Sequence, residues 1–334
     1  MAKPILISGI QPTGKLHLGN YLGALKNFVE LQNSEKYQCY FFIADYHSLT
    51  ENFDPKEKTG QIFNLATDYL SAGIDPKKSV IFLQSQAPQS TELAWILNTQ
   101  TPFGELRRMT QFKEKSENQQ ENINVGLFTY PLLMAADIIL YDAQFVPVGE
   151  DQLQHLELAR TLARKFNSKF PGRTGGKTFM EPKPILTTTP RLMSLDDPAK
   201  KMSKSQPAGC LFLDDAPEVI EQKIKRAVTD SGSEIKYDPI NKAGISNLLH
   251  IYSDLSGKSI SQLEKQFSGK SYSQFKESAA KTISDYFKSF RNKKAAFSKK
   301  SAAVKKILSV NAAKVQKIAD KKLSEIKTKL GLSL

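Results

Sequence analysis

The chain has 334 residues, of which 40% are apolar and 24% are charged, and it carries a formal net charge of +13. This composition predicts a soluble globular protein with room for two domains. Cys39 and Cys210 are too few for a disulfide framework, a Cys₄ zinc site or an iron–sulfur cluster, and the four histidines show no metal-ligand spacing, so we expect no protein-bound metal. No apolar run is long enough for a signal peptide or a membrane span. We therefore expect a cytoplasmic protein with no membrane partner, and the positive charge indicates a polyanionic one.

Strand-like apolar runs alternate with amphipathic helices from Ile5 to about Pro190. The predicted strands are 5–7, 38–44, 79–83 and 145–148, and the predicted helices are 21–32, 56–72, 91–98, 131–141 and 152–166. This alternation predicts an α/β fold with a parallel sheet. Pro147 favours an edge position or a strand end for the last of these strands. Such sheets bind ligands beyond the carboxyl ends of their strands, where polar residues follow each run, at 8–9, 45–47, 84–86 and 149–152.

The first strand leads through a turn with glycine and proline into a helix, an arrangement that offers backbone N–H groups to a phosphate. Gly9, Gly14 and Lys15 have the spacing of a Walker loop, but Leu16 stands where a Mg²⁺-binding hydroxyl is required, which excludes that loop. The stretch Pro12-Thr-Gly-Lys-Leu-His-Leu-Gly-Asn20 resembles the HIGH signature of class I aminoacyl-tRNA synthetases instead. An ordinary helix-opening loop explains this stretch equally well when it is considered alone.

Strand signals end at about Asp214, and helices are predicted from there to 228 and over 246–255, 259–267, 271–290 and 301–330. The last helix needs a partner for its apolar stripe, while its lysine face is more often solvated than RNA-binding. The polar segment 101–124 lies between two strand units, so it is an insertion. We divide the chain into a catalytic domain (1–195), a loop with a helical domain (196–300) and a C-terminal helix that packs back on the body (301–334).

The stretch Lys201-Met-Ser-Lys-Ser205 matches the KMSKS signature of class I synthetases residue for residue. A mobile loop with two cations could close over a triphosphate and neutralise charge as pyrophosphate leaves. The presence of this stretch together with His17 and Asn20 makes a chance resemblance to the class I synthetases remote. The resemblance narrows to the bacterial-type tryptophanyl-tRNA synthetases through further segments, which are 8–14, 19–24, 109–113, 129–137, 148–152, 193–195 and 244–249.

That resemblance implies a tryptophan pocket made of Asp137, Tyr130, Met134, Gln111 and Gln152, to which we add His47 as a side chain that could touch a ligand. Tyr130, Met134 and Asp137 are spaced i, i+4, i+7, which places them on one helix face. From spacing alone, a solvent-facing Asp137 is the simpler interpretation; the resemblance instead gives it the indole N–H to accept. Capping its own loop is the more common role for a lone histidine such as His47.

The resemblance also implies the residues that handle ATP. Its catalytic set is His17, Asn20, Lys201 and Lys204, and its ATP contacts are Gln11, Pro12, Thr13, Gly19, Asn20, Gly149, Glu150, Asp151, Leu192, Lys201, Met202, Ser203, Lys204 and Ser205. Asp151 suits the ribose hydroxyls, while Gly19 would let the nucleotide approach the backbone. Ile7 and Leu192 depart from the family pattern and leave the packing of the pocket open.

The resemblance implies a Rossmann-like parallel sheet with an all-helical C-terminal domain that recognises the anticodon. It implies ATP-dependent activation of L-tryptophan and transfer to tRNA-Trp, with Mg²⁺ bound through the ATP phosphates, by a homodimer whose contact includes the insertion 101–124. A tyrosyl-tRNA synthetase is the nearest alternative because it shares the fold. A small H-x-G-H nucleotidyltransferase would leave the helical half unexplained. A non-catalytic RNA-binding paralogue is opposed by the presence of His17, Asn20 and Lys204.

Overall fold

The computed structural model describes residues 3–110, 123–171, 176–187 and 192–333. A five-stranded sheet forms the centre of the molecule, and all its strands are parallel, in the order β3-β2-β1-β4-β5. The strands are β1 (Ile5–Ile10), β2 (Gln38–Ile43), β3 (Ser79–Leu83), β4 (Phe145–Val148) and β5 (Lys183–Leu186). The strand order reverses between β1 and β4, and in such sheets this reversal opens a crevice at the carboxyl ends of the two strands.

The sequence pattern does not predict β5, and its prediction for the position of β4 in the sheet is only partly right. The sequence of β5, Lys-Pro-Ile-Leu, is short and largely exposed, so it carries no buried-strand signal. Because β4 pairs with both β1 and β5, an edge position for β4 is wrong, whereas the strand does end one residue after Pro147. Its register with β1 is limited to Leu6 opposite Phe145. A proline that cannot donate a ladder hydrogen bond is therefore tolerated inside the sheet.

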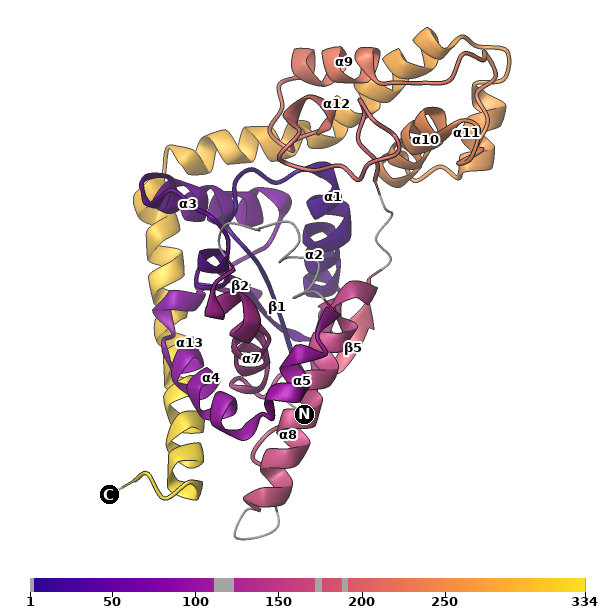
Figure 1. The fold of residues 1–334 in the computed structure, drawn as a ribbon. Helices are drawn as coiled ribbons and strands as arrows, with labels where there is room; N and C mark the ends of the chain where they lie inside the picture. Colours follow the sequence, from indigo (N-terminus) through magenta and orange to yellow (C-terminus); the bar gives the residue numbers. More distant parts are fainter. Residues whose placement is uncertain (1–2, 111–122, 172–175, 188–191, 334) are drawn as a thin grey trace.

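Helices cover both faces of this sheet (Figure 1). They are α1 (Leu18–Asn20), η1 (Tyr21–Leu25) and α2 (Lys26–Asn33), which are continuous, and α3 (Pro55–Ala72), α4 (Gln89–Gln100), α5 (Phe103–Arg107), α7 (Val125–Ile139) and α8 (Leu153–Lys169). The predicted helices of this half are confirmed, but α7 begins at Val125 rather than at the predicted Pro131. Pro131 lies inside the helix, where it removes one backbone hydrogen bond without ending the element.

Alternate strand residues point to opposite faces of the sheet, and this builds two apolar cores. Leu6 and Phe41 belong to the core on one face, with α2 and α3. Ile7 and Phe42 belong to the core on the other face, with α4, α7 and α8. The second core also includes Val315, Ala319, Leu323 and Ile326 of the last helix.

The rest of the described chain is helical beyond Leu213: α9 (Pro217–Arg226), α10 (Ala243–Ser256), α11 (Ile260–Gln266), α12 (Tyr272–Ser298) and α13 (Ser301–Lys329). This confirms the prediction that strands end at about Asp214. Figure 1 shows α12 running from the helical half back to the body, and α13 descending along the body beside α4. Among the helices of the described ranges, none is both long and apolar enough to cross a bilayer.

A buried charge cluster joins α12 to the body. Lys294 on α12 places its Nζ 2.8 Å from Asp68 Oδ1 on α3 and 3.0 Å from Asp214 Oδ2. Lys15 completes the cluster at 3.3 Å from the other oxygen of Asp214. The side chain of Asp68 is only 2% exposed, so its charge depends on Lys294 for compensation.

We predict that Lys294→Met lowers the free energy of unfolding by about 3–5 kcal/mol, because it leaves the Asp68 carboxylate buried without its cation. Urea denaturation followed by circular dichroism measures the change. Lys281→Met is the matched control, because Lys281 lies on the same helix and pairs with Asp285 on the exposed surface. Equal losses in the two variants would contradict a buried role for Lys294.

Candidate functional site

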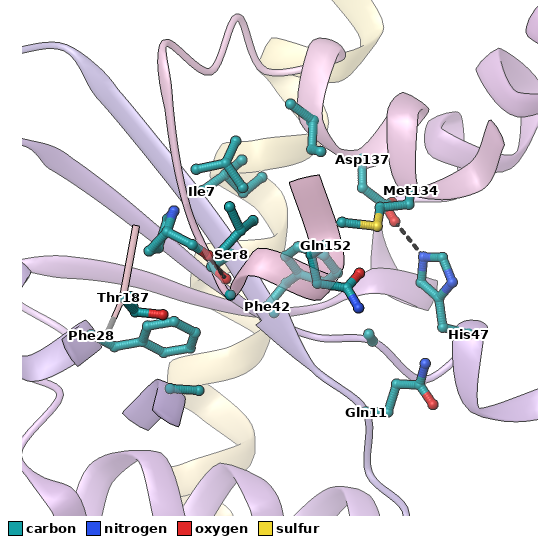
Figure 2. A pocket seen from close by; sticks show the side chains of 18 of the residues that line it. Ile7, Ser8, Gln11, Phe28, Phe42, His47, Met134, Asp137, Gln152 and Thr187 are labelled. Carbon is teal, nitrogen blue, oxygen red and sulfur yellow. Dashed lines mark hydrogen bonds and ion pairs between the residues drawn. The ribbon is translucent and has the colours of Figure 1, made fainter. Parts of the chain in front are cut away.

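A cavity of about 500 Å³ lies at the carboxyl ends of β1 and β4, where the strand order reverses. Ile7, Ser8 and Gly9 of β1 form one wall of it, and Phe42 of β2 contributes an aromatic ring (Figure 2). Eight of the residues singled out in the sequence line this one cavity: Gln11, His47, Tyr130, Met134, Asp137, Gly149, Asp151 and Gln152. The structure therefore brings together residues proposed for two different ligands.

Asp137 is buried on α7, with 3% of its surface exposed, so the alternative in which it faces water is wrong. Its Oδ2 lies 2.9 Å from His47 Nε2 and 2.8 Å from Gln84 Nε2. Figure 2 shows the contact between Asp137 and His47 as a dashed line. Burial raises the pKa of the Asp137 carboxyl, while the hydrogen bonds with His47 and Gln84 lower it. His47 therefore contacts the Asp137 carboxyl group at the cavity wall, and its role is not limited to its own loop.

Tyr130 and Met134 lie on the same face of α7 as Asp137, and all three line the cavity, as their spacing predicts. Tyr130 Oη lies 2.9 Å from Nε2 of His155, a fully buried residue of α8. The ring of His47 meets the Tyr130 ring edge-on, with 6.2 Å between centroids. An apolar and aromatic wall that ends at a buried carboxyl suits a flat apolar group carrying one hydrogen-bond donor.

His17 caps the N-terminus of the helix that begins at Leu18. Its Nδ1 accepts hydrogen bonds from the backbone N–H groups of Gly19, at 3.0 Å, and Asn20, at 3.4 Å. Because Nδ1 accepts, the proton of the neutral ring resides on Nε2, which becomes the outward donor. Asn20 Oδ1 accepts a hydrogen bond from the backbone N–H of His17 at 3.2 Å. The NH₂ group of Asn20 is therefore the part of that side chain left to donate outward.

Gly19 has a steric reason for lacking a side chain. A Cβ at this position would lie 2.9 Å from Cε1 of the His17 ring. Such a contact would push the ring away from the helix end. Glycine at position 19 therefore lets the His17 ring stay at the helix end, in addition to allowing the approach of a nucleotide expected from the sequence.

His17 is held neutral at physiological pH. Burial is the largest cause, and together with the charges of Lys204 and Lys201 it lowers the pKa of His17 to about 4. Both lysines belong to the Lys201–Ser205 loop, so this loop lies close to the histidine. The stretch with His17 and Asn20 and the Lys201–Ser205 loop therefore lie close together, as we expected from the sequence.

The chain beyond the loop is paired directly with the His17 segment. Leu18 N donates to Leu211 O at 2.8 Å, and Leu213 N donates to Leu16 O at 3.1 Å. His17 stands opposite Phe212 in this short antiparallel pairing. Within the loop, Lys204 donates from Nζ to Thr13 Oγ1 at 3.3 Å, and burial lowers the pKa of its ammonium group.

Several candidate residues do not face the cavity. Met202 and Leu192 are both 3% exposed, and their side chains belong to an apolar core and not to the cavity wall. Glu150, Lys201 and Ser205 are exposed outside the cavity wall. Ser203 Oγ lies 2.9 Å from Ser205 Oγ. Gln111 lies outside the described residues.

Two residues of the site were given no role from the sequence, although Gln84 belongs to the polar stretch 84–86 noted at a strand end. Gln84 directly follows β3, so its place at the carboxyl edge of the sheet was the available signal for it. His155 sits in an amphipathic helix, and nothing in its neighbourhood in the sequence marks it as the partner of Tyr130.

Comparison with known proteins supports the family resemblance that the sequence motifs indicate. Residues 1–288 match the family model described as tRNA synthetases class I (W and Y). A tryptophan–tRNA ligase from Wolinella succinogenes is 44% identical over 99% of this chain and 100% of its own. The crystal structure of tryptophanyl-tRNA synthetase from Mycoplasma pneumoniae superposes with a TM-score of 0.84 at 36% identity, covering 100% of this chain and 99% of that one. The Campylobacter jejuni enzyme, solved with ADP and tryptophan, gives 0.82 at 36% identity, with 98% and 99% covered.

We predict that the His17 ring titrates with a midpoint of about 4, measured by NMR of the imidazole C–H signals and assigned with a His17→Gln variant. Because this pKa lies below the ordinary 6.5, His17 contributes a loss of stability as pH falls from 6.5 towards 4. Lys204→Met should raise the midpoint without reaching 6.5, since burial is the larger cause. A midpoint near 6.5 in the unmodified protein would contradict this account of the site.

Proposed function

Because the chain belongs to the class I tRNA synthetases and, within them, to the tryptophan–tRNA ligases, we propose that the cavity between β1, β4 and α7 holds L-tryptophan beside ATP. The reaction catalysed is ATP-dependent formation of tryptophanyl-adenylate, followed by transfer of the tryptophanyl group to tRNA-Trp. The high-identity relatives disfavour both the tyrosyl enzyme and the non-catalytic paralogue. What remains to be proposed is the role of each residue.

The observation that carries the amino-acid site is Asp137, a buried carboxyl at the end of an apolar wall. Its two oxygens can accept more hydrogen bonds than those from His47, Gln84 and Ser90. An indole N–H would supply a further donor to this carboxyl group. Such a site rejects analogues that lack the donor. Tyr130, Met134 and Gln152 line the same space, and Gln111 is proposed from the resemblance alone.

ATP would occupy the adjoining part of the cavity. Gln11 follows β1, while Gly149 and Asp151 follow β4, and all three line the cavity, so the ribose hydroxyls can meet the Asp151 carboxylate. His17 Nε2–H and the Asn20 NH₂ would donate to phosphate oxygens. The other proposed contacts frame the phosphates by backbone or hydroxyl groups: Pro12, Thr13, Gly19, Glu150, Leu192, Met202, Ser203 and Ser205.

The first step needs placement and charge stabilisation. A tryptophan carboxylate oxygen attacks the α-phosphorus of ATP, the bond from that phosphorus to the bridging oxygen breaks, and pyrophosphate leaves with the electron pair. Lys201 and Lys204 would neutralise the charge that develops on pyrophosphate. A neutral His17 donates without having to lose a proton. In this arrangement the chain supplies no covalent nucleophile.

We place Mg²⁺ on the ATP phosphates. Among the described residues, no group of three or more His, Cys, Asp or Glu side chains is arranged to hold a metal ion. The loop side of the site presents lysines, which suit phosphates and repel cations. When bound, the ion would add charge neutralisation to that of the lysines.

We propose that the helical half, which the sequence analysis placed at 196–300, recognises the anticodon. The net charge of +13 supports a polyanionic partner and predicts binding that weakens with salt. The division into domains at 195 and 300 stays a prediction from the sequence.

We also propose that the chain forms a homodimer through exposed apolar residues on α4, α5 and the start of α7. Trp95 is 71% exposed, Phe103 68%, Val125 77% and Ile123 53%. The helices α4 and α5 both pack on α7, and neighbouring large exposed apolar side chains mark an interaction surface. The helix α7 runs from this face to Asp137, so a partner there would support the tryptophan pocket. Phe103 and Ile123 of this face belong to the insertion 101–124, which the resemblance placed in the dimer contact.

We predict that the protein exchanges pyrophosphate into ATP with tryptophan and not with tyrosine. Asp137→Ala should raise the KM for tryptophan roughly 100-fold or more, because it removes the acceptor for the indole N–H, while the KM for ATP stays near that of the unmodified protein. Asp137→Asn, which keeps the size of the side chain, guards against misfolding. Exchange with tyrosine alone would overturn the specificity, and a normal KM for tryptophan in both variants would remove Asp137 from the pocket.

We predict that Trp95→Asp converts the dimer to a monomer, because it places a charge in the apolar contact. Sedimentation velocity measures the change in mass. Trp95 is the only tryptophan of the chain, so its fluorescence emission in the unmodified protein should shift to longer wavelength on dilution. Ile240→Asp is the matched control, an apolar residue 89% exposed on the helical half. A monomeric unmodified protein would refute the dimer.

A further inference from the structure

The motif Gly244-Ile-Ser-Asn-Leu-Leu249 on α10 has no role in the function described above, yet its asparagine makes a specific contact. Asn247 Oδ1 accepts the backbone N–H of Met193 at 3.0 Å, and Asn247 Nδ2 donates to the backbone C=O of Met193 at 2.9 Å. Asn247 is buried, with 6% of its surface exposed. One side chain therefore binds both backbone groups of a single residue from a different part of the chain.

Met193 lies on the chain segment that carries the Lys201 loop. It stands opposite Lys201 in an antiparallel bridge. Two backbone hydrogen bonds flank that bridge: Met202 N donates to Leu192 O at 2.9 Å, and Ser194 N donates to Lys200 O at 2.8 Å. The two chain arms at the base of the loop thus form a short ribbon, and Asn247 holds one of them.

The helix that presents Asn247 is itself fixed against the same region. A Cβ at Gly244 would lie 2.0 Å from the carbonyl oxygen of Val228, so only glycine lets α10 approach this closely. Val228 N in turn donates to Leu195 O at 2.7 Å. The glycine and the asparagine of the motif therefore serve one contact, between α10 and segment 193–195.

We propose that Asn247 is a positioning residue for the adenylation step. By fixing Met193, it sets where the ribbon directs the Lys201–Ser205 loop, and so how Lys201 and Lys204 meet the triphosphate. Its effect is on ATP and the transition state, because its contacts lead to the loop and not to the residues around Asp137. This inference rests on the proposed role of the loop lysines.

The test is pyrophosphate exchange with tryptophan as a function of ATP and of tryptophan concentration, on the full-length protein. Asn247→Ala should lower kcat/KM for ATP by about tenfold, while the KM for tryptophan changes less than about twofold. Asn247→Asp should fall between Asn247→Ala and the unmodified protein, because it keeps the acceptor for Met193 N–H and loses the donor. It also retains the size of the side chain, so it covers the case in which the alanine variant fails to fold.

Ser246→Ala is the matched control. Ser246 precedes Asn247 on α10, is 3% exposed, and accepts the Asp238 N–H at 2.9 Å, away from Met193. It loses a buried contact of the same kind, and its ATP kinetics should stay near those of the unmodified protein. A drop in Ser246→Ala equal to that in Asn247→Ala would mean that any damage to α10 suffices, which would overturn the proposal.

A double variant separates an action through the loop from a general loss of structure. In a Lys204→Met background, Asn247→Ala should cost a clearly smaller factor than it does alone, because the cation that it positions is gone. Factors that multiply, or an equal rise in the KM for tryptophan and for ATP, would refute the inference. No exchange by the unmodified protein with tryptophan would refute the proposed function instead, so the two failures are distinguishable.

Discussion

The antiparallel pairing of residues 16–18 with residues 211–213 is the contact on which the arrangement of the site depends. Its hydrogen bonds, Leu18 N to Leu211 O and Leu213 N to Leu16 O, are made by backbone atoms, so they fix the distance between two chain segments more firmly than side chains could. His17 is in the middle of one segment, and the other continues from the lysine loop. Neither signature would form a site without this junction, because the sheet itself positions only the first.

The electrostatics of the site follow from that junction and from burial. At the loop end, burial and, to a smaller extent, the charges of Lys204 and Lys201 lower the pKa of His17, so its ring is a neutral hydrogen-bond donor. At the α7 end, the Asp137 carboxyl is surrounded by side chains that can donate to it, among them His47 and Gln84. The site is therefore divided into a cationic end, where we propose the phosphates, and an acceptor end, where we propose the indole. One strand-order reversal in the sheet accommodates both.

Most of the sheet and of the helices followed from the sequence because their apolar periodicity is strong. The strand β5 did not, since its exposed Lys-Pro-Ile-Leu run relies on its neighbour β4 rather than on burial. At the site, Tyr130, Met134 and Asp137 could be grouped by helical spacing, but only the fold shows that His47 and Gln84 reach the same carboxyl. His155 carries no local signal at all. The side chain of Met202 shows the opposite error, because a residue inside a nucleotide signature packs in the apolar core.

The helical half holds both arms of the lysine loop, and this limits which part of the loop can move. Asn247 binds the upstream arm at Met193, while Lys294 pairs with Asp214, which lies farther along the chain than the downstream arm. Between these anchors, in the described structure, the backbone hydrogen bonds of residues 203–208 stay within the local turn, and Lys204 reaches out to Thr13. Closure over a triphosphate would therefore rearrange mainly this short stretch, while Lys201 is held opposite Met193. Larger movements of the loop would have to carry α10 and α12 with it, which makes the position of the helical half part of the catalytic geometry.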